Sequence, residues 1–222
     1  MNQAEQSALQ SGIALAGMAG ARALQRQSVK QYRQRGMQET GTAFEQPALD
    51  QIVGEYTKQT GVTPEIVGNT DPYGRSVRKG EKTISLNQYA ASKFTLGHEL
   101  GHQSIEDAGG LPQWIQRHTY AGVNPNVMGL ATIGVAATVP SVRRAASLAL
   151  GMNYLNHSGR IVTEIEASRR GTNLLNQAGY PVSAVPGTLQ AASYVIAPAA
   201  TALGGLAAGR FLRSFVQEMG QN

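Results

Sequence analysis

One short segment of the sequence carries the residue types of a metal site. Residues 95–102 contain the pattern His-Glu-x-x-His, with His98 and His102 on either side of Glu99. On a helix, residues four apart lie one turn apart on the same face, so the two imidazoles can bind one ion. Glu99 lies about 100° around such a helix from His98, which suits a general base better than a ligand. The pattern predicts a metal site with His98 and His102 as ligands.

The chemistry expected at such a site is hydrolysis of a peptide bond. Zinc lowers the pKa of a bound water to about 7, and Glu99 is then placed to accept its proton while the metal polarises the peptide carbonyl. The chain contains no cysteine, so histidines and carboxylates must supply every ligand. Gly101 leaves room for a neighbouring backbone close to this helix. We therefore expect Zn²⁺ as the cofactor and a peptide or protein as the substrate.

A catalytic zinc ion needs a third protein ligand, and several residues compete for this role. The metzincin pattern is excluded because position 108 is Ala. Glu106 would require three successive turns of one helix to surround the ion, and His157 lies on a looser Asn-His-Ser-Gly stretch. A later helix offers Glu164 and Glu166, which face opposite ways on a helix, so only one of them can reach the metal.

Two short strands and a helix are expected just before the motif. Apolar residues at helical spacing predict a helix over residues 47–60. Residues 62–67 and 82–87 have the alternation or the β-branched content of strands, and a Gly- and Asn-rich loop is expected over residues 68–80. The predicted fold class is therefore α+β, mostly helical, with a small sheet beside the His-Glu-x-x-His helix.

The two helices that carry the candidate ligands have recognisable ends. Ser92 can cap the motif helix, and Gly109 can end it. The second helix is expected over residues 159–178, ended by the glycine and proline that follow. The charged residues of this helix could instead form a solvated face without a metal, because Glu166 and Arg170 at i, i+4 spacing are a typical surface ion pair.

Apolar segments lie at the start, in the middle and at the end of the chain. Residues 1–35 are predicted to form a hydrophobic and basic anchor helix, and residues 36–222 the metallopeptidase domain. Within that domain, hydrophobic helices are expected at about residues 191–209 and 127–155, the latter interrupted at Pro140. Only 15% of the residues are charged, which favours membrane association, although buried packing helices share this composition. The net charge of +5 is scattered along the chain, so no nucleic-acid partner is expected.

The order of the motifs resembles the YugP-type family of bacterial membrane-associated neutral zinc metallopeptidases, distant relatives of the membrane gluzincins. The family's Val-Glu-Phe-Asp-Ala-Ser-Arg-Arg signature is similar to residues 163–170, which follow the His-Glu-x-Gly-His core. Further similar segments are the basic stretch 29–34 with its tyrosine, the turn 71–73, Tyr89 and the run 191–195. The sequence departs from the family at Gln103, where a small residue is usual.

This resemblance implies a choice among the residues that spacing leaves open. It places the third metal ligand at Glu164. It also implies that the strand over residues 82–87 offers its edge to an extended peptide, which binds by β-augmentation. The residues expected to bind the substrate there are Thr83, Ser85 and Asn87. The candidates for stabilising the oxyanion are Arg160, Arg169 and Tyr89.

Two functional hypotheses follow from the sequence. The first is a membrane-associated, gluzincin-type zinc endopeptidase in which Glu99 is the catalytic base. The second is a non-catalytic structural or assembly protein, viral or membrane-scaffolding, that retains a metallopeptidase fold within a larger assembly. Glu99 favours the first hypothesis, because a purely structural zinc site has no use for a base beside an open coordination position.

Overall fold

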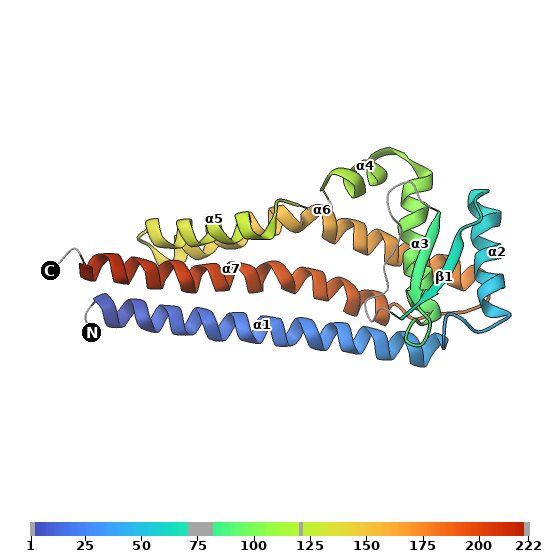
Figure 1. Ribbon diagram of the computed structural model, residues 1–222, viewed down its shortest axis with the longest axis horizontal. Helices are drawn as coiled ribbons and strands as arrows, with labels where there is room; N and C mark the ends of the chain where they lie inside the picture. Colours follow the sequence, from blue (N-terminus) through green and yellow to red (C-terminus); the bar gives the residue numbers. More distant parts are fainter. Residues whose placement is uncertain (1–2, 71–81, 120–121, 220–222) are drawn as a thin grey trace. The chain divides into compact units, whose positions relative to one another are not determined.

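The computed structural model of the protein describes residues 3–70, 82–119 and 122–219. The chain is mostly helical and has one small sheet, as the predicted α+β class requires (Figure 1). The elements in chain order are α1 (Gln3–Thr40), α2 (Ala48–Thr60), β1 (Glu65–Asn69), β2 (Thr83–Asn87), α3 (Lys93–Ala108), α4 (Gly110–Thr119), α5 (Pro125–Thr138), α6 (Val142–Gln177) and α7 (Val185–Met219). The predicted turn at residues 71–73 and most of the predicted loop over 68–80 lie outside the described residues.

The chain divides into two compact units. Unit 1 comprises Met1–Gln27, Ala121–Gly159 and Ser193–Asn222, and unit 2 comprises Ser28–Tyr120 and Arg160–Ala192. Three helices, α1, α6 and α7, contribute residues to both units. His98, His102 and Glu164 all belong to unit 2, so the candidate site lies within a single unit.

The core of unit 2 joins α2, β2, α3 and the second half of α6. Strand β2 alternates strictly, with Ile84 and Leu86 fully buried and the residues between them half-buried. This alternation places one face of the strand against the helices. The other buried members of the core are Ala43, Ile52, Tyr56, Ala91, Phe94, Leu96, Leu100, Leu174, Leu175 and Ala178.

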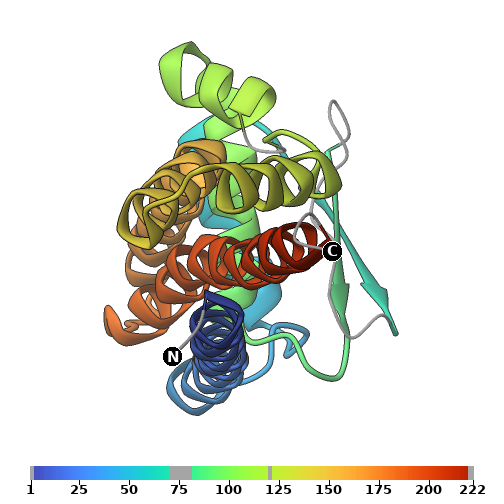
Figure 2. The same ribbon diagram turned by 90° about the vertical axis from the view of Figure 1, so that its left-hand side faces the viewer.

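The sheet of unit 2 consists of β1 and β2, which run parallel and side by side (Figure 1, Figure 2). Their register pairs Glu65 with Thr83 and Asn69 with Asn87. Strand β2 agrees with the prediction over 82–87. Strand β1 begins later than the predicted residues 62–67, because Pro64 has no backbone N–H and therefore stands before the strand rather than inside it.

The motif helix α3 has the predicted ends. The Ser92 side chain accepts a hydrogen bond from the backbone N–H of Thr95, and Gly109 ends the helix at φ 69°. Sequence reasoning missed α4, because it took the glycines and Pro112 only as a stop signal. The structure uses two left-handed glycines to turn the chain, and Pro112 stands in the first turn of the new helix, where its missing N–H costs nothing.

The second ligand-bearing helix, α6, is much longer than the predicted residues 159–178. It begins at Val142, just after Ser141, whose Oγ accepts a hydrogen bond from the backbone N–H of Arg144. The predicted hydrophobic segment over residues 127–155, with its interruption at Pro140, corresponds to α5 and the start of α6. The division falls at Pro140, which cannot donate the backbone hydrogen bond that a continuous helix needs.

Unit 1 is built from the first part of α1, α5, the first part of α6 and the last part of α7. Its small buried cluster consists mainly of alanines, and Ser11 of α1 donates a hydrogen bond to the backbone oxygen of Ala207 in α7. These parts of α1 and α7 run side by side in Figure 1. Within the described residues, α7 alone is long and apolar enough to cross a membrane, a property that the core helices of soluble proteins share.

Candidate metal centre

Three predicted ligands converge in unit 2. One ligand atom from each of His98, His102 and Glu164 lies within 4.8 Å of the other two. The Oε2 atom of Glu164 is 3.1 Å from Nε2 of His98 and 3.6 Å from Nε2 of His102. The histidines come from α3 and the carboxylate from α6. The structure thus brings together the three residues that the sequence proposed as ligands, and this buried group can hold a metal ion.

Close contact between α3 and α6 makes this convergence possible. A Cβ atom at Gly101 would overlap the backbone carbonyl of Ala167, and a Cβ at Gly171 would overlap the carbonyl of Gly97. Both crossing points therefore need a residue without a side chain. Because Gly101 precedes His102 and Ala167 lies one turn after Glu164, this close packing sets the distance between the two sets of ligands.

The two distances from the Glu164 carboxylate are compatible with a metal ion bound between the carboxylate and the imidazoles. With zinc-to-ligand bonds of 2.0–2.1 Å and tetrahedral angles, ligand atoms lie about 3.3 Å apart. The two distances from the Glu164 carboxylate, 3.1 and 3.6 Å, lie on either side of that value. Glu164 is 1% exposed, which excludes a solvated carboxylate as the explanation for its position. Buried charges are normally paired or bound to metals, and this carboxylate meets two imidazoles.

Helix α4, which follows the motif helix α3, fixes the orientation of His102. Gln116 donates hydrogen bonds from Nε2 to Glu106 and to the backbone oxygen of His102, which leaves its Oε1 facing Nδ1 of His102 at 3.1 Å. An amide oxygen only accepts, so Nδ1 carries a proton, and Nε2 is the ring nitrogen that faces Glu164. With Nδ1 held in this way, Nε2 is the nitrogen available to a metal, and a hydrogen-bonded Nδ1 is the usual support for a histidine ligand.

His98 is supported from α6 and approached from α7. Its Nδ1 lies 3.1 Å from the hydroxyl of Ser168, and its Nε2 lies 2.7 Å from the side-chain amide of Gln190. Gln190 is 4% exposed, so its amide is held inside the unit on the ligand side of the imidazole. The ligand atom of His98 therefore faces both the Glu164 carboxylate and an amide group.

The electrostatics of the cluster favour a charged carboxylate. Burial opposes ionisation of Glu164, but hydrogen bonds from His102 and His98 and the charges of these rings outweigh it, so the pKa of Glu164 lies well below its usual value. Burial also favours neutral His102. The interactions with Glu164, followed by the charge of Glu99, overcome this effect and raise the pKa of His102 to about 9.

The predicted base, Glu99, lies half-buried on α3 between the two histidines in sequence. Its Oε2 atom is buried, and within the described parts of the chain it has no hydrogen-bond partner. Tyr32 of α1 lies close enough for the negative charge of Glu99 to affect its pKa. Burial raises the pKa of Tyr32, a hydrogen bond with Thr95 lowers it to a smaller extent, and the negative charge of Glu99 raises it further.

The rival ligands serve other contacts. Glu106 accepts hydrogen bonds from Gln116 and Arg117, so it supports α4 instead of facing the cluster. Glu166 is bound by Arg169 and Arg170 on the other side of α6, as the helical spacing predicts. His157 belongs to unit 1, where its Nδ1 lies 2.9 Å from the backbone oxygen of Asn153.

The predicted substrate-binding residues lie on β2, and each of their side chains is hydrogen-bonded to another part of the chain. Thr83 donates a hydrogen bond to Glu65, Ser85 accepts one from Asn69, and Asn87 accepts two from the backbone of the turn that follows. One edge of β2 pairs with β1, and within the described residues its second edge pairs with no strand. Binding of a peptide at that edge stays a prediction.

The three oxyanion candidates have different positions. Arg160 lies on α6 one turn before Glu164, on the same side of the helix. Arg169 binds Glu166 and is largely exposed, whereas Tyr89 is 76% exposed in the turn after β2. Arg160 is therefore the candidate that lies nearest in sequence and helix face to a ligand.

Sequence reasoning missed three polar residues that contact the ligands: Ser168, Gln116 and Gln190. Ser168 could be found from the sequence, because it follows Glu164 at i, i+4 spacing and must share its helix face. Gln116 and Gln190 have no such signal, since each reaches its histidine from a different helix. The structure alone identifies these two contacts.

The chain was compared with models of protein families, with curated proteins and with solved structures. None of the three comparisons gave a match. The resemblance to the YugP-type peptidases therefore stays a prediction that depends on the motifs, and the functional argument depends on the geometry of the site.

Proposed function

We propose that this protein is a zinc-dependent peptidase of the gluzincin type. The observation that carries the proposal is the buried convergence of His98, His102 and Glu164, with ligand atoms within 4.8 Å of one another. Two histidines from one helix and a carboxylate from a later helix are the protein ligands of a catalytic zinc in such enzymes. The buried Oε2 atom of Glu99, which has no hydrogen-bond partner among the described residues, adds the base that hydrolysis requires.

Each residue has one role in this proposal. A zinc ion, when bound, acts as a Lewis acid on a peptide carbonyl and on a water molecule. His98, His102 and Glu164 hold that ion, while Ser168 and Gln116 keep the imidazoles oriented. Glu99 accepts a proton from the attacking water and passes it to the nitrogen of the leaving amine. Burial of the ligands strengthens these charge interactions.

The test compares the wild type with Glu99→Gln in metal content and in turnover of a casein-like protein substrate. We expect both proteins to bind one equivalent of zinc, because Glu99 is not a ligand. Hydrolysis by the variant should fall by about 10²–10⁴-fold, the usual contribution of a general base. Glu166→Gln is the matched control, since Glu166 lies on the other side of α6, and it should keep both properties.

Equal inactivity of the wild type and Glu99→Gln, with zinc bound in both, would support the non-catalytic assembly protein instead. Absence of zinc from the wild type would remove the peptidase hypothesis.

Membrane association is a second part of the proposal. Its support is the length and apolar composition of α7, together with exposed large apolar side chains in unit 1, such as Ile13, Leu155 and Phe211. Such side chains are costly in water and favourable in lipid. Purified full-length protein should float with phospholipid vesicles in a density gradient. Recovery of the protein only in the lipid-free fractions, without aggregation, would contradict this part.

A further inference from the structure

The amide of Gln190 occupies the side of His98 that a metal ion must use. In the structure it lies 2.7 Å from Nε2 of His98, which is the same atom that faces Glu164. A metal ion binds a histidine about 2.0–2.1 Å from the nitrogen, along its lone pair. The Gln190 amide thus lies inside the volume of the first coordination shell. Three ligands are already supplied, so the remaining position is the one that catalysis needs open.

We propose that Gln190 is a removable fourth ligand, whose side-chain carbonyl oxygen closes the metal site until a substrate's peptide carbonyl replaces it. This inference rests on the proposed function. Only a small movement is required, because neighbouring ligands of a tetrahedral zinc lie about 3.3 Å apart and the amide already lies 2.7 Å from the His98 nitrogen. A half-turn about the last side-chain bond exchanges the amide nitrogen and oxygen, and that torsion is broad in glutamine.

The chemistry of the ligand explains why it is replaceable. A glutamine carbonyl is a neutral amide oxygen, and it gives up a metal more readily than a carboxylate or an imidazole does. It is also the same functional group as the peptide bond of a substrate. Exchange of one amide for the other therefore changes neither the charge nor the ligand type of the site. The side chain acts as an internal substitute for the substrate.

The packing of α7 allows Gln190 both to reach the site and to leave it. A Cβ atom at Gly187, one turn earlier, would make ordinary van der Waals contact with Ser168 and Phe94, so this part of the helix packs against α6 and α3. Gln190 lies in the second turn of α7, near the end of the helix, where local opening costs less than in its middle.

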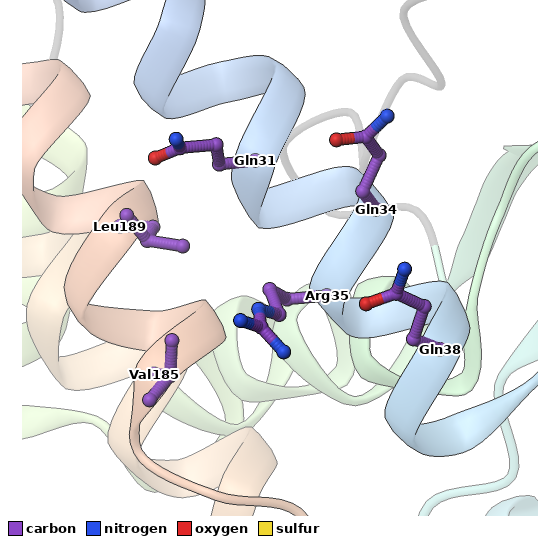
Figure 3. Close-up of a pocket in the computed structure, with 6 residues that line it drawn as sticks. All are labelled: Gln31, Gln34, Arg35, Gln38, Val185 and Leu189. Carbon is purple, nitrogen blue, oxygen red and sulfur yellow. The ribbon is translucent and has the colours of Figure 1, made fainter.

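The first two turns of α7 have open space on the side that faces away from His98. A pocket of 560 Å³ separates them from α1, and it is lined by Val185 and Leu189 of α7 together with Gln31 and Arg35 of α1. In Figure 3, the Gln31 and Arg35 side chains extend across this space toward α7. The start of α7 therefore has room to shift away from His98, which would withdraw Gln190.

The experiment uses the full-length protein loaded with Co²⁺, whose visible spectrum reports the coordination of the ion. Acetohydroxamate, a small metal-binding probe, is titrated into the wild type, Gln190→Ala, Gln190→Glu and Leu189→Ala. The probe must displace Gln190 in the wild type, and this competition lowers its apparent affinity. Gln190→Ala should bind the probe at least about tenfold more tightly, because the position is free. Gln190→Glu should bind it more weakly than the wild type, because a carboxylate is harder to displace.

Leu189→Ala is the matched control, since Leu189 lies next to Gln190 but faces the pocket, and it should match the wild type. Equal probe affinities and equal Co²⁺ spectra for the wild type, Gln190→Ala and Gln190→Glu would overturn the inference and leave the proposed function intact. If Gln190→Ala does not fold, the wild type and Gln190→Glu still give a decisive comparison. Failure of the wild type to take up Co²⁺ would instead overturn the proposed function and this inference with it.

Discussion

Gly101 of α3 lies so close to Ala167 of α6 that a Cβ atom at Gly101 would overlap the Ala167 carbonyl. Gly101 lies one residue before His102, and Ala167 lies one turn after Glu164. The contact between them therefore sets the distance between the ligands of the two helices. A glycine inside a helix is normally destabilising, so its presence here is explained by the close crossing of the helices.

Replacement of this glycine should damage both the fold and the metal site. Gly101→Ala forces α3 and α6 apart, and we expect a loss of about 1–3 kcal/mol in the free energy of unfolding, as for other overpacked cores. Zinc affinity should fall with it. The matched control is Gly54→Ala on α2, where an added Cβ would meet nothing within 4 Å.

In that control, the better helix propensity of alanine should stabilise the protein by about 0.5–1 kcal/mol. Chemical denaturation of both variants checks the opposite signs. Two stabilised variants would contradict the close crossing of α3 and α6.

The choice between the two carboxylates of α6 gives a second prediction. Glu164→Gln removes a charged ligand and leaves a neutral amide, so the purified variant should lose most of its zinc. Glu166→Gln has the same chemical change on the opposite side of the helix and should keep the metal. Metal analysis of the two variants after dialysis against a weak chelator provides the measurement. Zinc retained by Glu164→Gln and lost from Glu166→Gln would reverse the assignment.

A third prediction concerns the glutamine that orients His102. Gln116→Ala removes the acceptor for Nδ1 of His102, and zinc affinity should fall by about 10–100-fold, as is typical for partners of histidine ligands. Gln113→Ala on the same helix is the control, because Gln113 binds only the backbone oxygen of Glu106 in the described structure. Competition with a chromogenic chelator measures both affinities. Equal zinc affinities for the two variants would show that Gln116 does not hold His102.

The fourth prediction is a pH dependence of stability. Hydrogen bonds from Arg169, opposed by burial and assisted by Arg170, lower the pKa of Glu166 to about 2 from its usual 4.5. A lowered pKa in the folded state gives a stabilisation that is fully present above pH 4.5 and is lost as the pH falls toward 2. Because Arg169 is 62% exposed, solvent screening limits the effect, and we expect about 1 kcal/mol at neutral pH.

The measurement is the thermal melting temperature of the wild type and of Glu166→Gln at several pH values. The difference between the two proteins should be largest at neutral pH and should shrink between pH 4.5 and 2. A difference that stays constant through this range would mean that the carboxylate charge of Glu166 does not contribute.

Local spacing explains which parts of the site the sequence could predict. Residues at i, i+4 spacing share a helix face, so His98 and His102 could be paired from the sequence. Ser92 is a common N-cap residue and Gly109 a common helix end, so both ends of that helix could be predicted as well. The choice of Glu164 over Glu166 needed the resemblance to a family as well, because both belong to the same helix. The structure agrees with it, since the side of α6 that packs on α3 carries Glu164.

Tertiary contacts explain what the sequence could not predict. Gln116 and Gln190 reach the histidines from α4 and α7, and no spacing rule connects residues on separate helices. Helix α4 itself was missed because two glycines and Pro112 are equally suited to end a helix and to begin the next one. The unbroken length of α6 was missed for a similar reason, since Gly159 is tolerated inside a helix that is packed on its neighbours.

The two helices that meet at the ligands are far apart along the chain, and this protein has no cysteine with which to form a disulfide. An ion held by both helices would act as a cross-link that closes a long loop, and such closures remove the most entropy from the unfolded chain. Chain made in a metal-poor cell would lack that restraint and would unfold and be degraded sooner. The supply of the ion would then govern how much of the protein accumulates.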